Sequence, residues 1–297
     1  MRTSWADLPE TIRAGLEDHL GEVVDAADVG EGQNSDACAV LTTADGEAFV
    51  KAVHGFKIQT RWLRNELAAA TLTGGFAPRV LAHTEADGWL AVAFERVPGR
   101  AADLASGSPD LAVVADVAMM IGMLPATGLR PLTARWETTG WWARLAEASP
   151  EAVDGWDVPM LEELAGRLPG LVDGDRLVHT DLHGQQVRID DATNQVRVVD
   201  WGMPGAGPAW VDPAFLVLRL VEAGHTPAAA EDWARRSIPA YNDATDQALD
   251  AFAAYLAGMW SCWAVAPHPA PGAAHRARLA RGYAAGRLAL VGTTRGA

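Results

Sequence analysis

Two aspartates in the middle of the chain each follow a short hydrophobic run. Asp181 comes after Leu177-Val178-His179-Thr180, and Asp200 comes after Val198-Val199. The two acids are nineteen positions apart (200 − 181), with a turn between them, so a loop-strand-turn-strand arrangement can bring both carboxylates to one site. Phosphoryl transfer needs such a pair, because one acid orients the acceptor hydroxyl while the other holds Mg²⁺ against the phosphates. The spacing therefore favours that chemistry.

The N-terminal part of the chain supplies a candidate cation for the same reaction. Lys51, one of only two lysines, lies in the strand-like run 48–53, where a buried ammonium needs a partner. Glu66 follows fifteen residues later (66 − 51) on a helix-like segment and can be that partner. A positioned lysine neutralises phosphate charge and holds a nucleotide in line. Alone, Lys51 would more often be a solvated strand-edge residue, so the prediction rests on these residues together.

A short glycine-containing segment lies between two strand-like runs. It reads Gly30-Glu31-Gly32-Gln33-Asn34-Ser35, and its small residues let backbone N–H groups approach phosphate oxygens. A lone Gly-x-Gly more often marks a turn. Gly30, Gly32 and Ser35 are therefore nucleotide-binding candidates only in combination with Lys51.

The elements expected around these residues divide the chain into two lobes. Residues 1–96 read as a strand-rich lobe, with a helix over 9–20, a hairpin over 37–43 and 47–53, a helix over 59–72, and strands over 79–83 and 89–94. Val97-Pro98-Gly99 reads as a linker. Residues 97–297 read as mostly helical, with helices over 111–124, 159–168, 211–223, 227–241, 246–265 and 275–290. A β-rich island over 177–199, with a turn at 190–194, interrupts these helices and leads to Asp200.

The motifs around both aspartates resemble those of a known family. His179-Thr180-Asp181-Leu182-His183 resembles the catalytic-loop motif His-Gly-Asp-Leu-His of the aminoglycoside phosphotransferase family, which contains antibiotic and small-molecule kinases. Val199-Asp200-Trp201 resembles its metal-binding strand end, and residues 201–213 are similar to the segment that follows in many bacterial members. The resemblance covers nearly the whole chain. It implies an α+β, protein-kinase-like bilobal fold, with a small antiparallel-sheet N-terminal lobe that binds nucleotide and a larger, mostly helical C-terminal lobe that holds the acceptor site.

The same resemblance implies a role for each site residue, with ATP or GTP as phosphoryl donor and Mg²⁺ as cofactor. Asp181 would be the catalytic base and Asp200 the main Mg²⁺ ligand. Lys51 would contact the α- and β-phosphates and pair with Glu66. The remaining implied positions are the loop buttress Asp212 and a hinge, Glu95 to Val97, that meets adenine through backbone groups.

One position departs from the family pattern. Five residues after the catalytic acid the family usually places Asn as second metal ligand, and here the residue is Gln186. Gln carries the same amide oxygen on a longer stem, but Mg²⁺ tolerates little distortion of its octahedron. This departure motivates an alternative function from another class: a kinase-like, nucleotide-binding subunit of a peptide- or natural-product-modifying complex, with weak or no turnover.

Composition excludes several other classes. Hydrophobic residues make up 49% and charged residues 21%, which is typical of a globular domain. The net charge of −14 argues against nucleic acid as a partner, since phosphate backbones need a basic face. Two cysteines cannot form a disulfide framework. Without an apolar signal core or a long apolar run, we expect a cytoplasmic enzyme and no membrane partner; the oligomeric state stays open.

The acceptor is not specified by any motif. A polycationic aminoglycoside would need carboxylates around its site, and the overall charge is compatible with that. Residues 251–297, however, contain no Asp or Glu and five arginines. Other antibiotics, sugars, amino alcohols and a peptide Ser or Thr therefore stay open, as does a role in antibiotic resistance or biosynthesis. A protein kinase is disfavoured, because no Ala-Pro-Glu-type segment end follows Asp200.

Other conspicuous side chains favour structural roles. His183 could act as an acid or base, but a hydrogen-bonded histidine within the loop is the simpler interpretation. Large aromatics usually complete a core. We therefore assign Trp136, Trp141, Trp142 and Trp156 mainly to the core, with one or two available to line an acceptor cleft.

Overall fold

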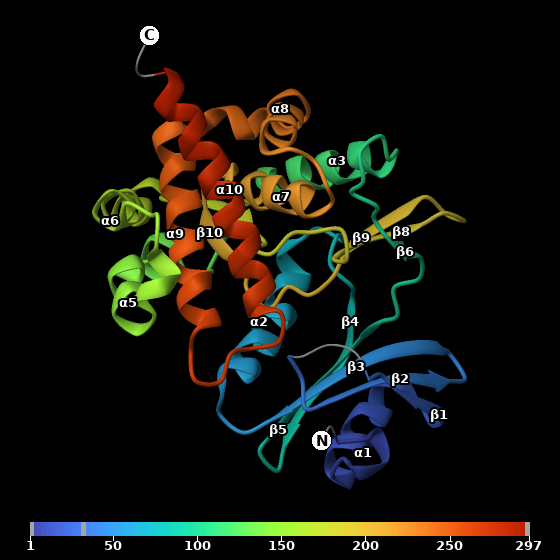
Figure 1. Cartoon of the computed structure of the whole chain (residues 1–297). Helices are drawn as coiled ribbons and strands as arrows, with labels where there is room; N and C mark the ends of the chain where they lie inside the picture. Colours follow the sequence, from blue (N-terminus) through green and yellow to red (C-terminus); the bar gives the residue numbers. More distant parts are fainter. Residues whose placement is uncertain (1–2, 31–33, 295–297) are drawn as a thin grey trace. The chain divides into compact units, whose positions relative to one another are not determined.

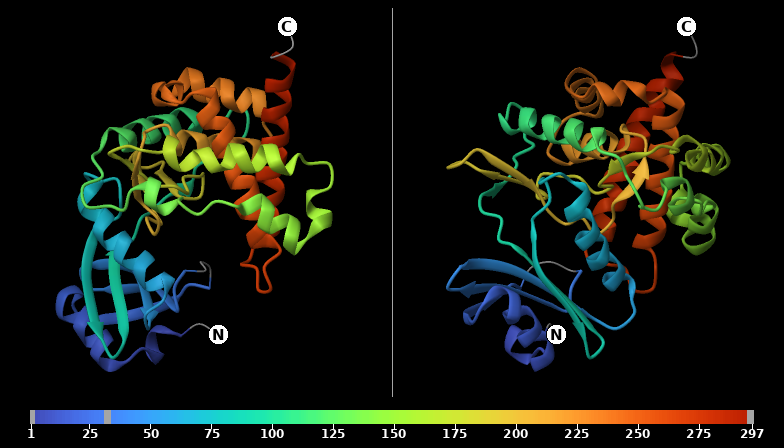
Figure 2. Two further views of the ribbon diagram at one scale, coloured as in Figure 1. Left: turned by 90° about the vertical axis from the view of Figure 1, so that its left-hand side faces the viewer. Right: turned by 180° about the vertical axis from the view of Figure 1, so that it is seen from behind.

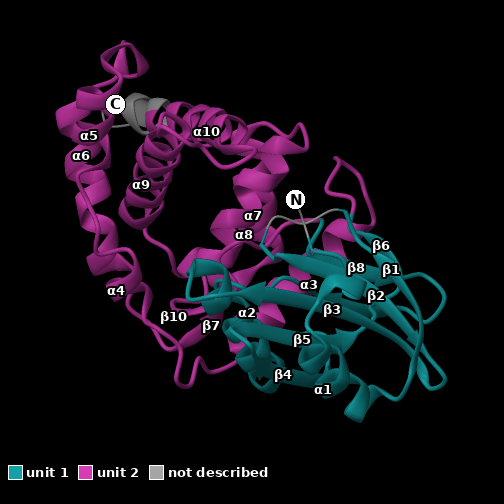
Figure 3. Ribbon diagram, turned by 90° about the horizontal axis from the view of Figure 1, so that it is seen from below, with its two compact units in different colours: residues 1–102, 185–204 teal, residues 103–184, 205–297 magenta. Residues whose placement is uncertain are grey.

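The computed structural model describes residues 3–30 and 34–294, with side chains through residue 288. Its residues cluster into two compact units (Figure 3). Unit 1 comprises Met1–Ala102 and Gln185–Pro204, and unit 2 comprises Asp103–Gly184 and Gly205–Ala297. The lobe boundary that the sequence suggests at residue 96 stays a prediction, and the two units are considered separately.

Unit 1 is built on a five-stranded antiparallel sheet with the order β1-β2-β3-β5-β4 (Figure 1). A leading helix lies against this sheet and closes a core with Trp5, Leu8, Ile12 and Leu16. The elements are α1 (Glu10–Leu20), β1 (Val23–Asp28), β2 (Ala37–Thr43), β3 (Gly46–His54), α2 (Ile58–Leu72), β4 (Val80–Ala86) and β5 (Trp89–Glu95), preceded by a 3₁₀ turn at Trp5–Asp7.

The pleat of β3 decides where Lys51 points. Side chains on a strand alternate between the two faces of the sheet. Val50 and Ala52 belong to the core that α1 covers, whereas Val53 packs with Leu63 of α2 on the other face. Lys51 shares the parity of Val53. Its side chain is therefore on the α2 side of the sheet.

A small three-stranded sheet completes unit 1. Strands β6 (Arg100–Ala101), β8 (Val187–Asp190) and β9 (Gln195–Val198) pair in the order β6-β8-β9. The β8–β9 hairpin turns where the sequence predicts, at 190–194, with Asn194 in the left-handed region at φ 56°. Backbone bonds tie the hairpin to the rest of the unit, since the Val198 amide donates to the Phe76 carbonyl (2.8 Å).

Unit 2 is a helical assembly around one short β ladder. Its strands β7 (Arg176–Val178) and β10 (Gly205–Gly207) pair antiparallel. Helices α9 and α10 lie side by side in both views of Figure 2. The helices are α3 (Asp110–Met123), α4 (Leu132–Arg135), α5 (Trp141–Ala148), α6 (Val158–Arg167), α7 (Val211–Glu222), α8 (Pro227–Ser237), α9 (Asp246–Ala264) and α10 (Ala273–Thr294), with 3₁₀ turns at Pro150–Val153, Leu168–Leu171 and Pro239–Asp243. None of the described helices is long and apolar enough to cross a bilayer.

Most of the predicted elements are present within a few residues, and the α+β class is confirmed. The helix expected over 227–241 is wrong at its end, because α8 stops at Ser237. Pro239 lacks an amide proton and forces the preceding residue out of the helical region, and Ile238 is extended (φ −129°, ψ 95°). The short helices α4 and α5 were not predicted, because neither is long enough to show a clear period.

Buried charge ties the C-terminal helices together. The Arg287 side chain on α10 is 4% exposed and pairs with Asp250 on α9 (2.7 Å) and Glu231 on α8 (2.7 Å). A buried arginine is tolerated only when its donors meet acceptors. Arg287 is one of the five arginines counted in residues 251–297, and its charge is thus neutralised inside unit 2.

Candidate functional site

A cluster of three charged side chains, two of them largely buried, lies in unit 1. Nζ of Lys51 donates to both carboxylate oxygens of Glu66 (2.9 and 2.8 Å) and to Oδ1 of Asp200 (3.2 Å). The Lys51 and Glu66 side chains are 14% and 9% exposed, against 34% for Asp200. The structure therefore brings together one amine and two acids that the sequence predicted, from β3, α2 and the end of β9.

The electrostatics of this cluster keep the lysine charged. Burial by itself would lower the pKa of Lys51, but the adjacent Glu66 and Asp200 carboxylates raise it above its ordinary value. Burial raises the pKa of Glu66, and the Lys51 ammonium opposes that effect. The result is a fixed positive charge whose partly exposed neighbour is Asp200.

Asp200 sits at a tightly constrained turn. Its backbone is left-handed at φ 66°, a conformation that costs a non-glycine residue about 1 kcal/mol or more. The turn is anchored on both sides: Nε1 of Trp201 donates to the Val198 carbonyl (2.7 Å), and Nδ2 of Asn65 on α2 donates to the Gly202 carbonyl (2.9 Å). These bonds hold the carboxylate beside Lys51.

Gln186 offers an unsatisfied amide oxygen in the same unit. Its side chain is buried, with the residue 7% exposed, and Oε1 has no hydrogen-bond partner among the residues that the structure describes. The backbone carbonyl of Gln186 accepts a hydrogen bond from the Val199 amide (2.9 Å). This bond continues the β8–β9 ladder, in which Val187 pairs with Val198. Gln186 is thus held next to the residue that precedes Asp200. A buried, unpaired acceptor is costly unless a ligand satisfies it.

The predicted hinge residues line a small cavity. Both the side chain and the backbone amide of Glu95 are hydrogen-bonded. Its carboxylate accepts from Arg79 (2.7 Å) and Arg197 (3.1 Å), and its amide donates to the Arg79 carbonyl (2.8 Å). Despite partial burial, these arginines hold the pKa of Glu95 below its ordinary value. The cavity is lined by Glu95, Arg96, Val97, Pro98, Arg188, Asp190, Gln195 and Arg197.

The glycine-containing segment is only partly described. Gly30 is exposed, with open space around its Cα, and Ser35 is half-buried just before β2. Gly32 lies outside the described residues. Sequence reasoning missed the neighbouring Asp36, whose carboxylate accepts from Nζ of Lys57 (2.6 Å) and from the His54 amide (2.8 Å). Asp36 thereby joins the segment before β2 to the end of β3.

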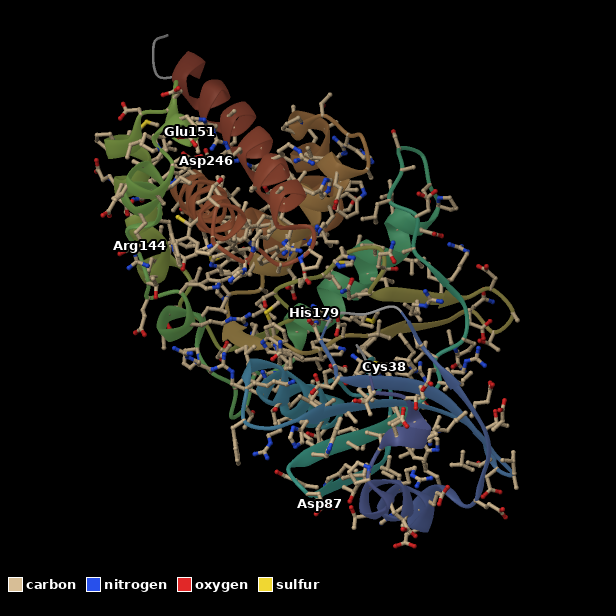
Figure 4. The ribbon with its side chains drawn as sticks, turned by 60° about the horizontal axis from the view of Figure 1, so that its bottom comes forward. Cys38, Asp87, Arg144, Glu151, His179 and Asp246 are labelled. Atoms are coloured by element: carbon tan, nitrogen blue, oxygen red, sulfur yellow. The ribbon has the colours of Figure 1, made fainter. Side chains whose placement is uncertain are left out.

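In unit 2, Asp181 lies in the loop that follows β7. The loop is held from helix α7 by Asp212, whose Oδ2 and Oδ1 accept the amides of His179 (2.7 Å) and Thr180 (2.8 Å). Asp212 is 2% exposed, and burial raises the pKa of its carboxyl. His179, labelled in Figure 4, is 1% exposed. Thr180 is left-handed at φ 64°, where the family motif has glycine.

Sequence reasoning missed the side chain that contacts Asp181. Nη2 of Arg219 on α7 donates to Oδ1 of Asp181 (2.9 Å), and Nη1 donates to Glu222 (3.0 Å). The signal was present: Arg219 interrupts the apolar run 214–221, two helical turns after Asp212.

His183 lies in the same environment. Its burial and the nearby Arg219 guanidinium lower its pKa to about 4, so the imidazole is neutral at pH 7. This agrees with a structural role within the loop. Of the four tryptophans assigned to the core, Trp136 and Trp142 are buried, whereas Trp141 and Trp156 are half-buried.

Comparison with known proteins identifies the family of the chain. Residues 25–255 match the model of the phosphotransferase enzyme family (APH). No curated protein sequence gives a significant match.

Solved structures share the fold at low sequence identity. A thermostable mutant of aminoglycoside phosphotransferase APH(4)-Ia, in ternary complex with AMP-PNP and hygromycin B, gives a TM-score of 0.64 at 14% identity, covering 94% of this chain and 98% of that one. Aminoglycoside phosphotransferase APH(3'')-Id from Streptomyces rimosus gives 0.56 at 21% identity (83% and 96% covered). Choline kinase LicA from Streptococcus pneumoniae gives 0.56 at 15% (91% and 96% covered). The match over most of the chain, together with this shared fold, shows that the protein belongs to the phosphotransferase enzyme family, the aminoglycoside phosphotransferase family that its motifs resemble.

Proposed function

We propose that this protein transfers the γ-phosphoryl group of ATP, with Mg²⁺, to a hydroxyl of a small molecule. The observation that carries the proposal is the buried Lys51, which is held charged between Glu66 and Asp200. A buried ammonium with two carboxylates is a costly arrangement for stability alone. It is well suited to phosphates, because it fixes a positive charge where negative charge must be neutralised.

On the donor side, Lys51 would contact the α- and β-phosphates while Glu66 holds its position. The segment with Gly30, Gly32 and Ser35 would cover the phosphates with backbone amides. Backbone groups of Glu95 and Val97 would meet the base. The solved structures with AMP-PNP, ADP and AMP bound support a nucleotide donor. Comparing ATP with GTP as donor tests the base preference.

The residues present fit a magnesium ion. Asp200 offers a partly exposed carboxylate, and Gln186 offers a buried amide oxygen without a protein partner. Both are the hard oxygen donors that Mg²⁺ prefers. Within the described part of the chain no cluster of three or more His, Cys, Asp and Glu side chains could hold a metal. Phosphate and water oxygens would therefore complete the shell, as is usual for Mg²⁺. The ion would neutralise phosphate charge.

On the acceptor side, Asp181 would orient the hydroxyl and accept its proton. As the acceptor oxygen bonds to the γ-phosphorus, the bond to the bridging oxygen of ADP breaks, and the proton leaves through Asp181 to water. Fixing the loop from Asp212 lowers the entropy cost of this alignment.

For the acceptor we propose an antibiotic, sugar or amino alcohol, in a resistance or biosynthetic role. One structural neighbour has hygromycin B bound and another is a choline kinase, and both support this range. The arginines of residues 251–297 argue against a cationic acceptor, but one of them, Arg287, is buried and paired with acids, which weakens that objection. We place the enzyme in the cytoplasm, with no nucleic-acid partner. The alternative of a nucleotide-binding subunit without turnover is not favoured, because the family and its solved relatives are phosphotransferases and kinases.

The test is acceptor-dependent ADP release. Purified protein with Mg²⁺ and ATP is incubated with aminoglycosides including hygromycin B, sugars and choline-type amino alcohols, and products are identified by mass spectrometry. Asp181→Asn should lower the rate of transfer about 10²–10⁴-fold and leave a small residual rate. Asp175→Asn, at an exposed acid before β7 (side chain 91% exposed), is the matched control and should keep it. A wild type that gives no phosphorylated product with any acceptor refutes the proposal.

A further inference from the structure

One face of helix α7 contacts three consecutive residues of the catalytic loop. Asp212 and Arg219 are seven residues apart, which is close to two helical turns, so they share a face. Asp212 accepts the backbone amides of His179 and Thr180, and Arg219 donates to the side chain of Asp181. The helix therefore holds both the backbone before the base and the base itself.

The Arg219 guanidinium is itself rigidly placed. The residue is 8% exposed, and its Cζ lies 6.0 Å from the ring centroid of Trp260. Nη1 donates to Glu222 (3.0 Å), and the other carboxylate oxygen of Glu222 contacts Nε2 of His275 on α10. Nε is buried without a partner among the described residues. A planar fork with two occupied arms has a fixed direction.

This geometry makes the two oxygens of Asp181 unequal. Oδ1 accepts from Arg219 (2.9 Å), whereas Oδ2 is the oxygen that this arginine does not hold. The Asp181 side chain is 33% exposed, so part of this carboxylate can be reached from solvent. A base must present its lone pair within hydrogen-bond reach of the hydroxyl, and small misplacements cost large factors in rate.

We propose that Arg219 is a positioning residue, which holds Oδ1 of Asp181 so that Oδ2 receives the acceptor proton, and that Glu222 and His275 hold Arg219 in place. This rests on the proposed function, since it assigns Asp181 the role of base. Arg219 touches neither nucleotide nor acceptor in this role. Its removal should lower kcat and leave the KM for ATP nearly unchanged.

The first test compares two substitutions of Arg219. Arg219→Met keeps the stem and removes the fork, and Arg219→Lys keeps one charge without the fork. With an acceptor found in the panel, we expect a loss in kcat of about 10- to 100-fold for both, with KM for ATP within about threefold. Arg287→Lys is the matched control, because it disturbs another buried arginine network in unit 2, and its kcat should stay within about threefold. An equal loss in kcat for Arg287→Lys, or an effect of Arg219→Met on KM alone, overturns the proposal.

Non-additivity tests whether Arg219 acts through Asp181. In the Asp181→Asn background, Arg219→Met should cause little further loss of residual kcat, because the base is already gone. Losses that multiply contradict the proposal.

A second double-mutant cycle, which does not depend on activity, measures chemical denaturation of four proteins: wild type, Asp181→Asn, Arg219→Met and the double variant. We expect a coupling of at least fivefold in the unfolding equilibrium constant between Asp181→Asn and Arg219→Met. Additive effects on unfolding refute the pairing. If wild type transfers no phosphoryl group, the proposed function fails, while the unfolding cycle still decides whether Arg219 holds Asp181.

Discussion

Replacing Asp212 by Asn should destabilise unit 2 and misplace Asp181, the proposed base. Both carboxylate oxygens of this residue accept backbone amides, at 2.7 and 2.8 Å, in a site that is 2% exposed. Asn keeps one acceptor and turns the other into a donor that faces an amide N–H. Because the two side chains have nearly the same shape, the substitution changes hydrogen bonding rather than packing.

The magnitude follows from the two bonds. A hydrogen bond to a charged acceptor contributes about 1.5–3 kcal/mol, and a buried donor left unpaired costs about 1–3 kcal/mol. Burial raises the pKa of Asp212, so removing its charge returns part of that cost. The expected net loss in the free energy of unfolding is about 2–3 kcal/mol, a large share of the stability of a typical domain.

Thr180 provides a second, more specific readout. Its backbone is held at φ 64°, which a β-branched residue adopts only at a cost of about 1–2 kcal/mol. Without the Asp212 bond the loop should relax away from this angle, and kcat should fall about 100-fold. Glycine adopts the angle without strain. The double variant Asp212→Asn, Thr180→Gly should therefore recover part of kcat.

The assays are urea unfolding followed by tryptophan fluorescence and steady-state ADP release. Asp232→Asn, at a side chain that is 67% exposed on α8, is the matched control and should change stability by less than about 0.5 kcal/mol. A loss below about 1 kcal/mol for Asp212→Asn, or no recovery of kcat with Thr180→Gly, would show that this clamp does not position the loop.

Three further predictions concern the other charged and amide groups. Lys51→Met should reduce kcat about 10²–10³-fold and destabilise the fold by about 3–5 kcal/mol. Adding Glu66→Gln to Lys51→Met should restore stability but not activity, and recovery of both would contradict the proposed role of Lys51 at the phosphates. Gln186→Asn should change the Mg²⁺ concentration that gives half-maximal activity by at least about threefold; an unchanged magnesium titration argues against Gln186 as a ligand. In the folded protein the pKa of His183 is lowered from 6.5 to about 4, so its contribution to stability is present above pH 6.5 and is lost as pH falls toward 4, by about 2–3 kcal/mol. In urea titrations, His183→Gln should therefore reduce the loss of stability between pH 6.5 and 4, and an unchanged loss would refute this.

Much of the candidate site could be predicted from sequence, because its signals are local. Asp200 directly follows a hydrophobic run, Asp181 follows another after His179-Thr180, and the turn at 190–194 between them is encoded by its own polar residues. The parity of Lys51 on its strand likewise depends only on alternation. The family motifs then add the pairing with Glu66 and the role of Asp212.

Arg219 could not be assigned in the same way. An arginine inside an apolar helix is visible in the sequence, but its partner is 38 residues away (219 − 181), and no period links the two. The same holds for Arg287, whose charge looked available from composition and is in fact paired inside the unit. Charge counts ignore burial, and burial depends on which helices pack together.

The sequence by itself determined the family and the α+β class and predicted the reactive groups, since residue types, short motifs and hydrophobic periods are properties of neighbouring residues. Only the tertiary structure decided that the β8–β9 hairpin clusters with the N-terminal sheet, that Oε1 of Gln186 is buried without a partner, and that α7 holds Asp181. These depend on contacts between segments far apart in the chain. Their energies come from desolvation and from hydrogen-bond geometry, which arise only once the segments have packed.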